Sequence, residues 1–298
     1  MTELDWGRTV DRSLVHRDSI AEVLLTDISQ VSRTAFLVAA QWPRSHRIYR
    51  PDQHGRHDPM LLLETVRQAG LALSHYGFGV PYNFKAIMHD IGFELHADAE
   101  PRGVTAATNL TVRVDCDQVV MRGTTLRGMT VILQVSANGQ HFATGTGSLS
   151  WLSPRTFQAL RARSRIAHQG PGSPATGLTP VASRHRGSAD ALICAEDLAP
   201  LRRRLLVPLD HPVYFDHPLD HVPGMLLIDG VWQAVSAAGS GTPGRLVECR
   251  MTLPAFTELA PEAWIVLGPA AGAGRVGFRV EQAGHTTAEG TLRSLPAR

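Results

Sequence analysis

Two acidic residues in this 298-residue chain follow runs of apolar residues, and each is followed four positions later by glutamine: Glu64 with Gln68, and Asp229 with Gln233. Glu64, Arg67 and Gln68 stand at i, i+3 and i+4, so they share one face of a helix. Desolvation raises the pKa of a half-buried carboxylate on such a helix, which can then act as a general base near neutral pH. The alternative is a solvated acid paired with Arg67 on an exposed stripe, which contributes little to stability.

A histidine joins this pattern in the second half of the chain. His217 stands twelve residues before Asp229, and Pro223-Gly224 provides a tight turn directly before the apolar run. A lone histidine before a helix is usually polar surface. The combination of a histidine, a turn, an apolar run and an acid in this order is much more specific, and it marks the segment as a candidate catalytic site.

The two acids belong to an internal repeat. Residues 49–69 read YRPDQHGRHDPMLLLETVRQA, and residues 214–234 read YFDHPLDHVPGMLLIDGVWQA. They align without a gap at an offset of 165 residues (229 − 64), which pairs Glu64 with Asp229 and Gln68 with Gln233. The repeat indicates that one domain was duplicated and that each copy offers a carboxylate at the same place.

Each copy is expected to contain one long helix followed by antiparallel strands. The first helix should have Asp58 as its N-cap and Pro59 at its first position, and it is apolar nearly all round, as a buried helix is. Strands are expected at 22–25, 33–44, 87–95, 107–116, 128–137 and 140–152, and in the second copy at 246–256, 263–270, 275–284 and 285–295. Asn138-Gly139 is a strong hairpin signal. This pattern predicts an α+β fold in which a sheet wraps around a helix.

Composition excludes several classes of protein. The hydrophobic content is 43% and the charged content 19%, so the chain can bury a core. It has no apolar run of 18 residues and no signal-peptide pattern, and a cytoplasmic protein without a membrane span is expected. The three cysteines have no CxxC spacing, which argues against a metal site and a disulfide framework: Cys116, Cys194 and Cys249.

Of the 29 basic residues, 28 are arginine and Lys85 is the only lysine. The net charge of +2 is therefore weak evidence for nucleic-acid binding, and none is expected. The clusters Arg161–Arg163–Arg165 and Arg202–Arg203–Arg204 are expected to be solvated surface. Residues 164–189, rich in Gly, Pro, Ser, Arg and His, are expected to form a mobile linker.

The chain resembles the AfsA-type A-factor (γ-butyrolactone) synthases in four segments: VHRDSIAEVLLTD, AQWPRSHRIY, DPMLLLETVRQAG and HPVYFDHPLDHVPGMLLIDGVWQA. The last segment is also similar to the active-site segment of the hotdog-fold hydroxyacyl-carrier-protein dehydratases. The resemblance implies a tandem (double) hotdog, each an antiparallel sheet wrapped around a central helix. The expected hotdog domains are residues 1–160 and 191–298, with a linker at 161–190.

The resemblance implies an acyltransferase. It would join a β-ketoacyl-carrier-protein thioester to the hydroxyl of dihydroxyacetone phosphate, giving an ester that closes to a butenolide precursor of a γ-butyrolactone- or furan-type signalling molecule. The implied catalytic residues are His217, Glu64 and Asp229. Backbone N–H groups at 59–61 or 224–226 would hold the oxyanion.

Arginine is the natural phosphate clamp, so Arg67 is the first candidate for that role and Arg44 the second. The other expected substrate-binding residues are Gln68, Gln233 and Trp232. Trp232 stands where the family often carries arginine, and this departure implies either an altered second site or a pocket reshaped for a different acyl chain.

The expected partners are an acyl-carrier protein and dihydroxyacetone phosphate, with no metal, no cofactor and a pseudo-dimeric monomer. Two alternatives remain open from the sequence. One is a dehydratase or thioesterase acting on acyl thioesters, and the other is a non-catalytic module that binds acyl-type ligands. The sequence leaves acyl chain length and branching undetermined.

Overall fold

The structure is a computed structural model, and it describes residues 3–103, 105–167, 188–193, 201–238 and 244–296. The chain divides into two compact units, residues 1–157 and 158–298. The border falls inside the helix α2 (Pro154–Ala167), so the first residues of the predicted linker are helical. The rest of that linker, from 168 to 187, lies outside the described residues.

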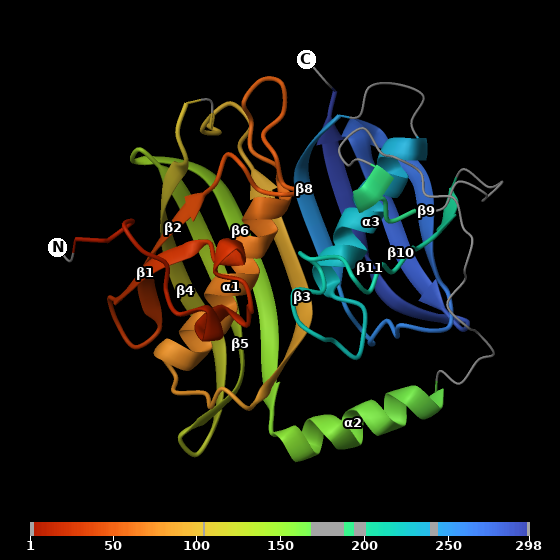
Figure 1. Cartoon of the computed structure of the whole chain (residues 1–298), viewed down its shortest axis with the longest axis horizontal. Helices are drawn as coiled ribbons and strands as arrows, with labels where there is room; N and C mark the ends of the chain where they lie inside the picture. Colours follow the sequence, from red (N-terminus) through yellow and green to blue (C-terminus); the bar gives the residue numbers. More distant parts are fainter. Residues whose placement is uncertain (1–2, 104, 168–187, 194–200, 239–243, 297–298) are drawn as a thin grey trace. The chain divides into compact units, whose positions relative to one another are not determined.

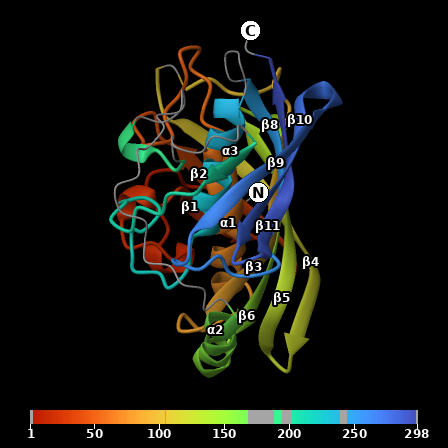
Figure 2. The same ribbon diagram turned by 90° about the vertical axis from the view of Figure 1, so that its right-hand side faces the viewer.

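Unit 1 is an antiparallel sheet packed against one buried helix, α1 (Met60–Tyr76). The strands follow the order β1-β2-β4-β5-β6-β3, and they are β1 (Leu25–Gln30), β2 (Ala35–Trp42), β3 (Lys85–Leu95), β4 (Thr108–Arg122), β5 (Thr125–Ala137) and β6 (Gln140–Leu152). In Figure 1 α1 lies in front of these strands, and Figure 2 shows the long strands β4 and β5 side by side. Almost every residue of α1 is buried, as its apolar sequence predicts.

Unit 2 repeats this arrangement with α3 (Gly224–Ala238) as its helix. Its strands follow the order β8-β11-β10-β9-β7, and they are β7 (Arg202–Arg204), β8 (Arg245–Thr252), β9 (Ala263–Ala271), β10 (Arg275–Gln282) and β11 (His285–Leu295). The segment from 206 to 223, which precedes α3, contains neither helix nor strand.

Turn chemistry closes the last hairpin of each unit. Asn138 and Gly139 join β5 to β6 with φ angles of 51° and 77°. Ala283 and Gly284 join β10 to β11 with φ angles of 49° and 79°. Two successive positive φ angles define a type I′ turn, which matches the twist of the strands it connects.

The predicted opening strand at 22–25 is wrong in its position. Ile20–Glu22 is a 3-10 turn, and β1 begins only at Leu25. The Gln68 side chain binds this stretch of backbone at Glu22 O and Leu24 N, while Leu24 O accepts a hydrogen bond from Gln41 N of β2 at 2.9 Å. Directly before β1, the N–H of Leu24 thus bonds to a side chain 44 positions further along the chain.

Candidate functional site

The helices α1 and α3 begin differently. The helix α1 begins at Met60 with Pro59 as its N-cap, one residue later than predicted, and the Asp58 side chain still accepts a hydrogen bond from Met60 N at 2.9 Å, while its carbonyl accepts one from Leu61 N at 3.0 Å. At α3, Pro223 O accepts from Leu226 N at 3.0 Å. Within the part of the chain that the structure describes, no acceptor is found for the first two N–H groups of α3, those of residues 224 and 225.

Glu64 lies on α1 with only 3% of its surface exposed, held by two arginines and a glutamine. Arg67 donates hydrogen bonds to both carboxylate oxygens, from Nε to Oε2 at 2.9 Å and from Nη2 to Oε1 at 2.7 Å. Arg17 Nη2 lies 2.9 Å from Oε1, and Gln68 Nε2 donates to the same oxygen at 2.7 Å. The carboxylate therefore sits in a dense cluster of donors.

The expectation of a raised pKa at Glu64 is wrong. Burial acts to raise the pKa, but the charges of Arg17 and Arg67 and the hydrogen bonds from Arg67 and Gln68 outweigh it. Together they lower the pKa of Glu64 from 4.5 to about 2. A carboxylate this acidic is ionised at neutral pH and is a weak proton acceptor. In the structure Glu64 holds two guanidinium groups in place, and whether it also takes part in the reaction stays a prediction.

Arg17 enters this cluster from a tight turn at the start of the chain. The 3-10 helix Arg12–Val15 ends at His16, whose φ of 51° is left-handed and turns the chain so that Arg17 follows directly. His16 Nε2 lies 2.8 Å from His75 Nε2. His75 donates from Nδ1 to Val80 O at 2.7 Å, so in its neutral form His75 Nε2 accepts from His16. Burial lowers the pKa of His75, which favours that neutral form.

Gln68 and Gln233 have the same structural role in the two units. Gln68 Oε1 accepts from Leu24 N at 2.9 Å, and its Nε2 donates to Glu22 O at 2.7 Å. Gln233 Oε1 accepts from Leu192 N at 2.8 Å, and its Nε2 donates to the carbonyl of residue 190 at 3.2 Å. Both are fully buried, and each ties its helix to an irregular segment of backbone. Whether they also touch a substrate stays a prediction.

Each unit also contains a buried histidine at an equivalent position just before the repeated segment, His46 in unit 1 and His211 in unit 2. His46 Nδ1 accepts from Tyr49 N at 3.0 Å and stacks on the Tyr49 ring at 4.7 Å. His211 Nδ1 accepts from Tyr214 N at 3.3 Å and stacks on the Tyr214 ring at 4.5 Å. The two histidines stand at the same offset as the acids, 165 residues (211 − 46). Each fixes the turn that leads into the loop before its helix.

Asp229 in unit 2 has an environment unlike that of Glu64. It is fully buried on α3 and accepts a hydrogen bond from the Tyr214 hydroxyl. No arginine takes the position of Arg67 here, because Trp232 stands there and is buried. The two copies thus share the acid, but the residue three positions after it is arginine in unit 1 and tryptophan in unit 2.

His217 forms a dyad with the residue before it. Its Nδ1 lies 2.6 Å from Asp216 Oδ1, and the Asp216 side chain is only 2% exposed. An ionised carboxylate can only accept, so Nδ1 carries the hydrogen and the neutral ring keeps a lone pair at Nε2. The imidazole is 31% exposed, which leaves it accessible to a substrate.

Arg44 and Arg67 occupy different environments within unit 1. Arg44 is exposed and donates from Nη1 to Thr105 O at 3.0 Å. Arg67 is 17% exposed, and its Nη2 also donates to Val15 O at 3.2 Å. Among the described residues no partner is found for Arg67 Nη1, which leaves two N–H groups for an anion. Arg67 is therefore the better placed of the two for binding phosphate.

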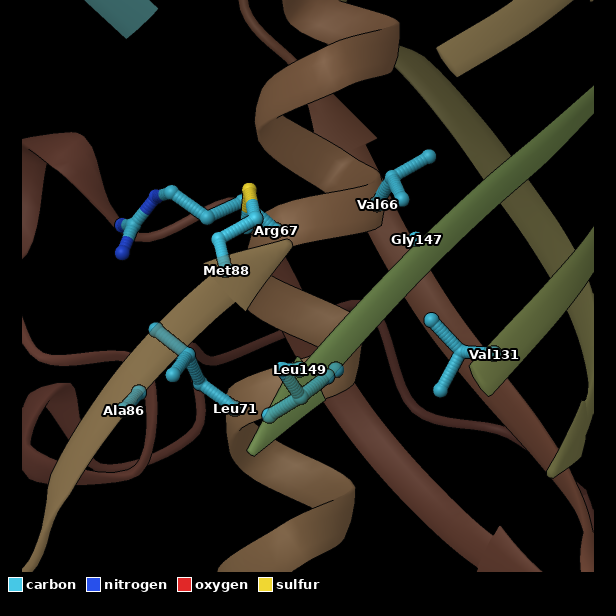
Figure 3. Close-up of a pocket in the computed structure, with 9 residues that line it drawn as sticks. Val66, Arg67, Leu71, Ala86, Met88, Val131, Gly147 and Leu149 are labelled. Atoms are coloured by element: carbon cyan, nitrogen blue, oxygen red, sulfur yellow. The ribbon is translucent and has the colours of Figure 1, made fainter. Parts of the chain in front are cut away.

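A small apolar pocket of about 20 Å³ lies beside α1. It is lined by Val66, Arg67, Gly70, Leu71, Ala86, Met88, Val131, Gly147 and Leu149. Figure 3 shows the Arg67 guanidinium pointing away from Val131 and Leu149, so only the stem of that side chain joins the apolar lining. The cavity admits a group about the size of one water or methyl, and by itself it does not identify a substrate.

Comparison with known families agrees with these two helix–sheet units. The profile of the A-factor biosynthesis hotdog domain, AfsA, matches residues 3–153 and 185–256. The chain belongs to the AfsA family. The resemblance inferred from the sequence and the predicted α+β double hotdog are both confirmed.

Two relatives of this AfsA-family chain carry the name 2-oxo-3-(phosphooxy)propyl 3-oxoalkanoate synthase. The one from Streptomyces virginiae is 36% identical over 280 residues, which is 93% of each chain. The one from Streptomyces coelicolor is 30% identical over 268 residues, covering 88% of this chain and 84% of its own. Among solved structures, the 12:0-ACP thioesterase from Umbellularia californica is similar, with a TM-score of 0.53 and 10% identity. That match covers 90% of this chain and 100% of the thioesterase, and it shows the fold alone.

Several residues that surround the candidate site residues were not predicted from the sequence. The signal for His46 and His211 is the pattern His-x-x-Tyr, which stands directly before each copy of the repeat. Asp216 is marked only by its place next to His217. Arg17 lies in the segment VHRDSIAEVLLTD, which carries the resemblance, but nothing local indicates that it reaches Glu64.

Within the described residues, no helix is long and apolar enough to cross a membrane. The same residues contain no group of three or more His, Cys, Asp or Glu side chains that could hold a metal ion.

Proposed function

We propose that the protein is an acyltransferase that forms an ester between a 3-oxoacyl group and the hydroxyl of dihydroxyacetone phosphate. Family membership supports this function, as do the synthase names of relatives that span the length of the chain. The product in those names is an ester of a 3-oxoalkanoic acid with a phosphooxy-oxopropyl alcohol. Such an ester follows from attack of the alcohol on an activated acyl group.

The observation that carries the chemistry is the His217–Asp216 dyad. A thioester is already activated, so the enzyme needs a base for the incoming hydroxyl and donors for the oxyanion. His217 Nε2 takes the proton of the hydroxyl as its oxygen bonds to the thioester carbonyl carbon. The carbon–sulfur bond then breaks, and the leaving thiolate takes the proton back from His217. Asp216 holds the ring in the required tautomer and stabilises the imidazolium between these steps.

The N-terminus of α3 is the better candidate for the oxyanion hole. Its first two N–H groups, at residues 224 and 225, have no acceptor among the described residues. At α1, by contrast, the first N–H group already bonds to the Asp58 carboxylate. Positively polarised N–H groups at the start of a helix stabilise developing negative charge. The segment 216–225 of unit 2 therefore supplies both a base and oxyanion donors.

Asp229 and Glu64 have supporting roles in this proposal. Asp229 fixes Tyr214, two residues before Asp216, through the hydroxyl hydrogen bond. Glu64, with its pKa of about 2, does not take the proton and instead orients Arg67. Within unit 1, Arg67 Nη1 keeps two N–H groups that suit an anion such as phosphate, a role for which guanidinium is well suited.

The acyl donor is proposed to be a carrier-protein thioester. The chain is proposed to act as a pseudo-dimeric monomer in the cytoplasm. The relatives' names specify the acyl class and the phosphorylated alcohol but no carrier, so the donor must be tested separately.

Mass spectrometry of the products tests the reaction. The protein is incubated with a 3-oxoacyl thioester, with and without dihydroxyacetone phosphate, and compared with His217→Asn. We expect a phosphorylated ester only when both substrates are present, and a kcat lower by about 100- to 10,000-fold in the variant. Its control is His285→Asn, which changes an exposed histidine at the start of β11 in the same unit. Free acid formed equally without the phosphate would indicate a thioesterase, and a dehydrated thioester would indicate a dehydratase.

The phosphate role of Arg67 has its own test. Arg67→Ala should raise KM for dihydroxyacetone phosphate about 10-fold or more, while KM for the thioester changes little. The matched control is Arg113→Ala, an exposed arginine of unit 1 paired with Asp115. An unchanged KM for the phosphorylated substrate would remove Arg67 from phosphate binding.

A further inference from the structure

The loop that carries His217 has no regular structure to hold it. Residues 206–223 form only turns and bends. Near its end, Val222 N donates to Thr257 O at 2.8 Å. A general base must stay within hydrogen-bond reach of its substrate, so a loop in this position needs further anchors.

Arg161 of α2 is such an anchor. Only 3% of its surface is exposed, so the expectation of a solvated cluster is wrong for Arg161, whereas Arg163 is exposed as expected. Arg161 Nε donates to Asp220 Oδ2 at 3.0 Å, and Nη2 donates to Asp220 O at 2.8 Å. One guanidinium therefore fixes both the side chain and the backbone of a loop residue three positions after His217.

The other side of Arg161 is bound to Glu258. Arg161 Nη1 lies 2.8 Å from Glu258 Oε1, and Nη2 lies 2.6 Å from Oε2, a bidentate pair. The guanidinium also lies over the Phe256 ring, 4.4 Å from its centroid. These contacts fix the orientation of the planar guanidinium group. A lysine ammonium group could not make the same bidentate contacts.

Glu258 is in turn fixed to the sheet of unit 2. Its N–H donates to Gln282 Oε1 at 2.7 Å, and Gln282 Nε2 donates to Glu258 O at 2.9 Å and to Pro261 O at 2.6 Å. Gln282 is the last residue of β10 and is 1% exposed. A continuous chain of polar contacts thus runs from β10 through the buried residues Glu258 and Arg161 to Asp220, which is partly exposed.

Asp220 is well suited to remain an anion in this chain of contacts. The hydrogen bond from His221 and the contact with Arg161 hold the pKa of its carboxyl well below the usual range, although burial acts in the opposite direction. His221 Nδ1 lies 2.8 Å from Asp220 Oδ1, so the two oxygens have different partners. Arg161 therefore connects the loop to α2 at Asp220, and the contact with His221 lies within the loop itself.

We propose that Arg161 is a positioning residue that holds the loop 216–220 against unit 2, so that His217 is presented to the substrate. The proposal rests on the role given to His217 under the proposed function. Arg161 touches neither substrate, and its effect on the rate passes through His217. Because a displacement of about 1 Å at a catalytic group can lower the rate about 100-fold, loss of the anchor should be visible in kcat.

Amide hydrogen exchange tests the anchor without any substrate. In Arg161→Lys, peptides covering residues 211–223 should exchange at least about 10-fold faster, while peptides from α3 and β10 are unchanged. The control is Arg204→Lys, which alters another arginine–glutamate pair of unit 2, that with Glu262 at 2.9 Å. Unchanged exchange in the loop of Arg161→Lys would overturn the proposal, whatever the activity.

Kinetics then separates positioning from general structural support. Arg161→Ala should lower kcat about 100-fold with KM for the thioester within about 3-fold, and added guanidinium should restore part of the loss. In a His217→Asn background the same change should lower kcat no further, since the two residues act on one step. An equal loss in both backgrounds would overturn the proposal. If Arg161→Ala does not fold, Asp220→Asn and Arg161→Lys give the same comparison. A failure of His217→Asn to lower kcat would refute the base, while the exchange result would still decide the anchor.

Discussion

Replacing Glu64 by glutamine removes the negative charge that Arg17 and Arg67 share inside unit 1. The pKa of Glu64 is about 2 in the folded protein and about 4.5 in an unfolded chain, so folding favours the ionised form. The stabilisation is fully present above the unfolded pKa and is lost as the pH falls from about 4.5 towards 2. Each pKa unit corresponds to about 1.4 kcal/mol, so Glu64 contributes about 3 kcal/mol at pH 7.

The same linkage gives the expected pH dependence of the Glu64→Gln variant. At pH 3 the carboxylate still contributes about 1 kcal/mol, so the difference between the wild type and the variant should shrink by about 2 kcal/mol from pH 7 to pH 3. The measurement is a urea titration at pH 7, 5, 4 and 3. It is followed by amide exchange of peptides from α1, because these report on unit 1 by itself.

An exposed ion pair of the same unit supplies the control. Asp115 pairs with Arg113 at 3.0 Å on the surface, and Asp115→Asn should change the free energy of unfolding by less than about 1 kcal/mol at every pH. A Glu64→Gln difference that stays constant from pH 7 to pH 3 would refute the reasoning. In that case Glu64 would not be more acidic in the folded protein than in the unfolded chain.

Two further predictions concern packing and thiol chemistry. A Cβ at Gly145 would lie 2.4 Å from Val66 Cγ2, so Gly145→Ala should lower the free energy of unfolding by about 1–3 kcal/mol in urea titrations, and Val66→Ala should relieve part of that loss. Burial raises the pKa of the Cys116 thiol to about 12 and that of Cys249 even further, so iodoacetamide at pH 8 should label neither in the native protein and both after unfolding, as read by peptide mass spectrometry. Rapid native labelling of Cys249 would contradict the packing of β8.

The local elements could be predicted from the sequence because their signals are local. The alternation in 128–137 and 140–152 and the turn at Asn138-Gly139 predict the hairpin of β5 and β6, which the structure contains. The start of β1 could not be predicted in this way. The segment before it bonds to the Gln68 side chain at the backbone of residues 22 and 24, a long-range contact that no local pattern predicts.

Within the candidate site, the sequence predicted buried carboxylates, and the expectation of a raised pKa is wrong for one of them. The apolar run before Glu64 correctly predicts burial, and burial alone would raise its pKa. The opposite outcome depends on Arg17, 47 residues earlier in the chain, whose position no local pattern reveals. Arg161 was misjudged for the same reason, since its partner Glu258 is 97 residues away.

The sequence by itself therefore determined the repeat, the two apolar helices, the paired acids and the family to which the chain belongs. Periodicity, turn residues and motif order are properties of neighbouring positions, and they persist in any fold that the chain adopts. Only the tertiary structure decided that the pKa of Glu64 is lowered and that Arg161 is buried. These properties depend on the distances between charged groups, and the fold brings together side chains that are far apart in the sequence.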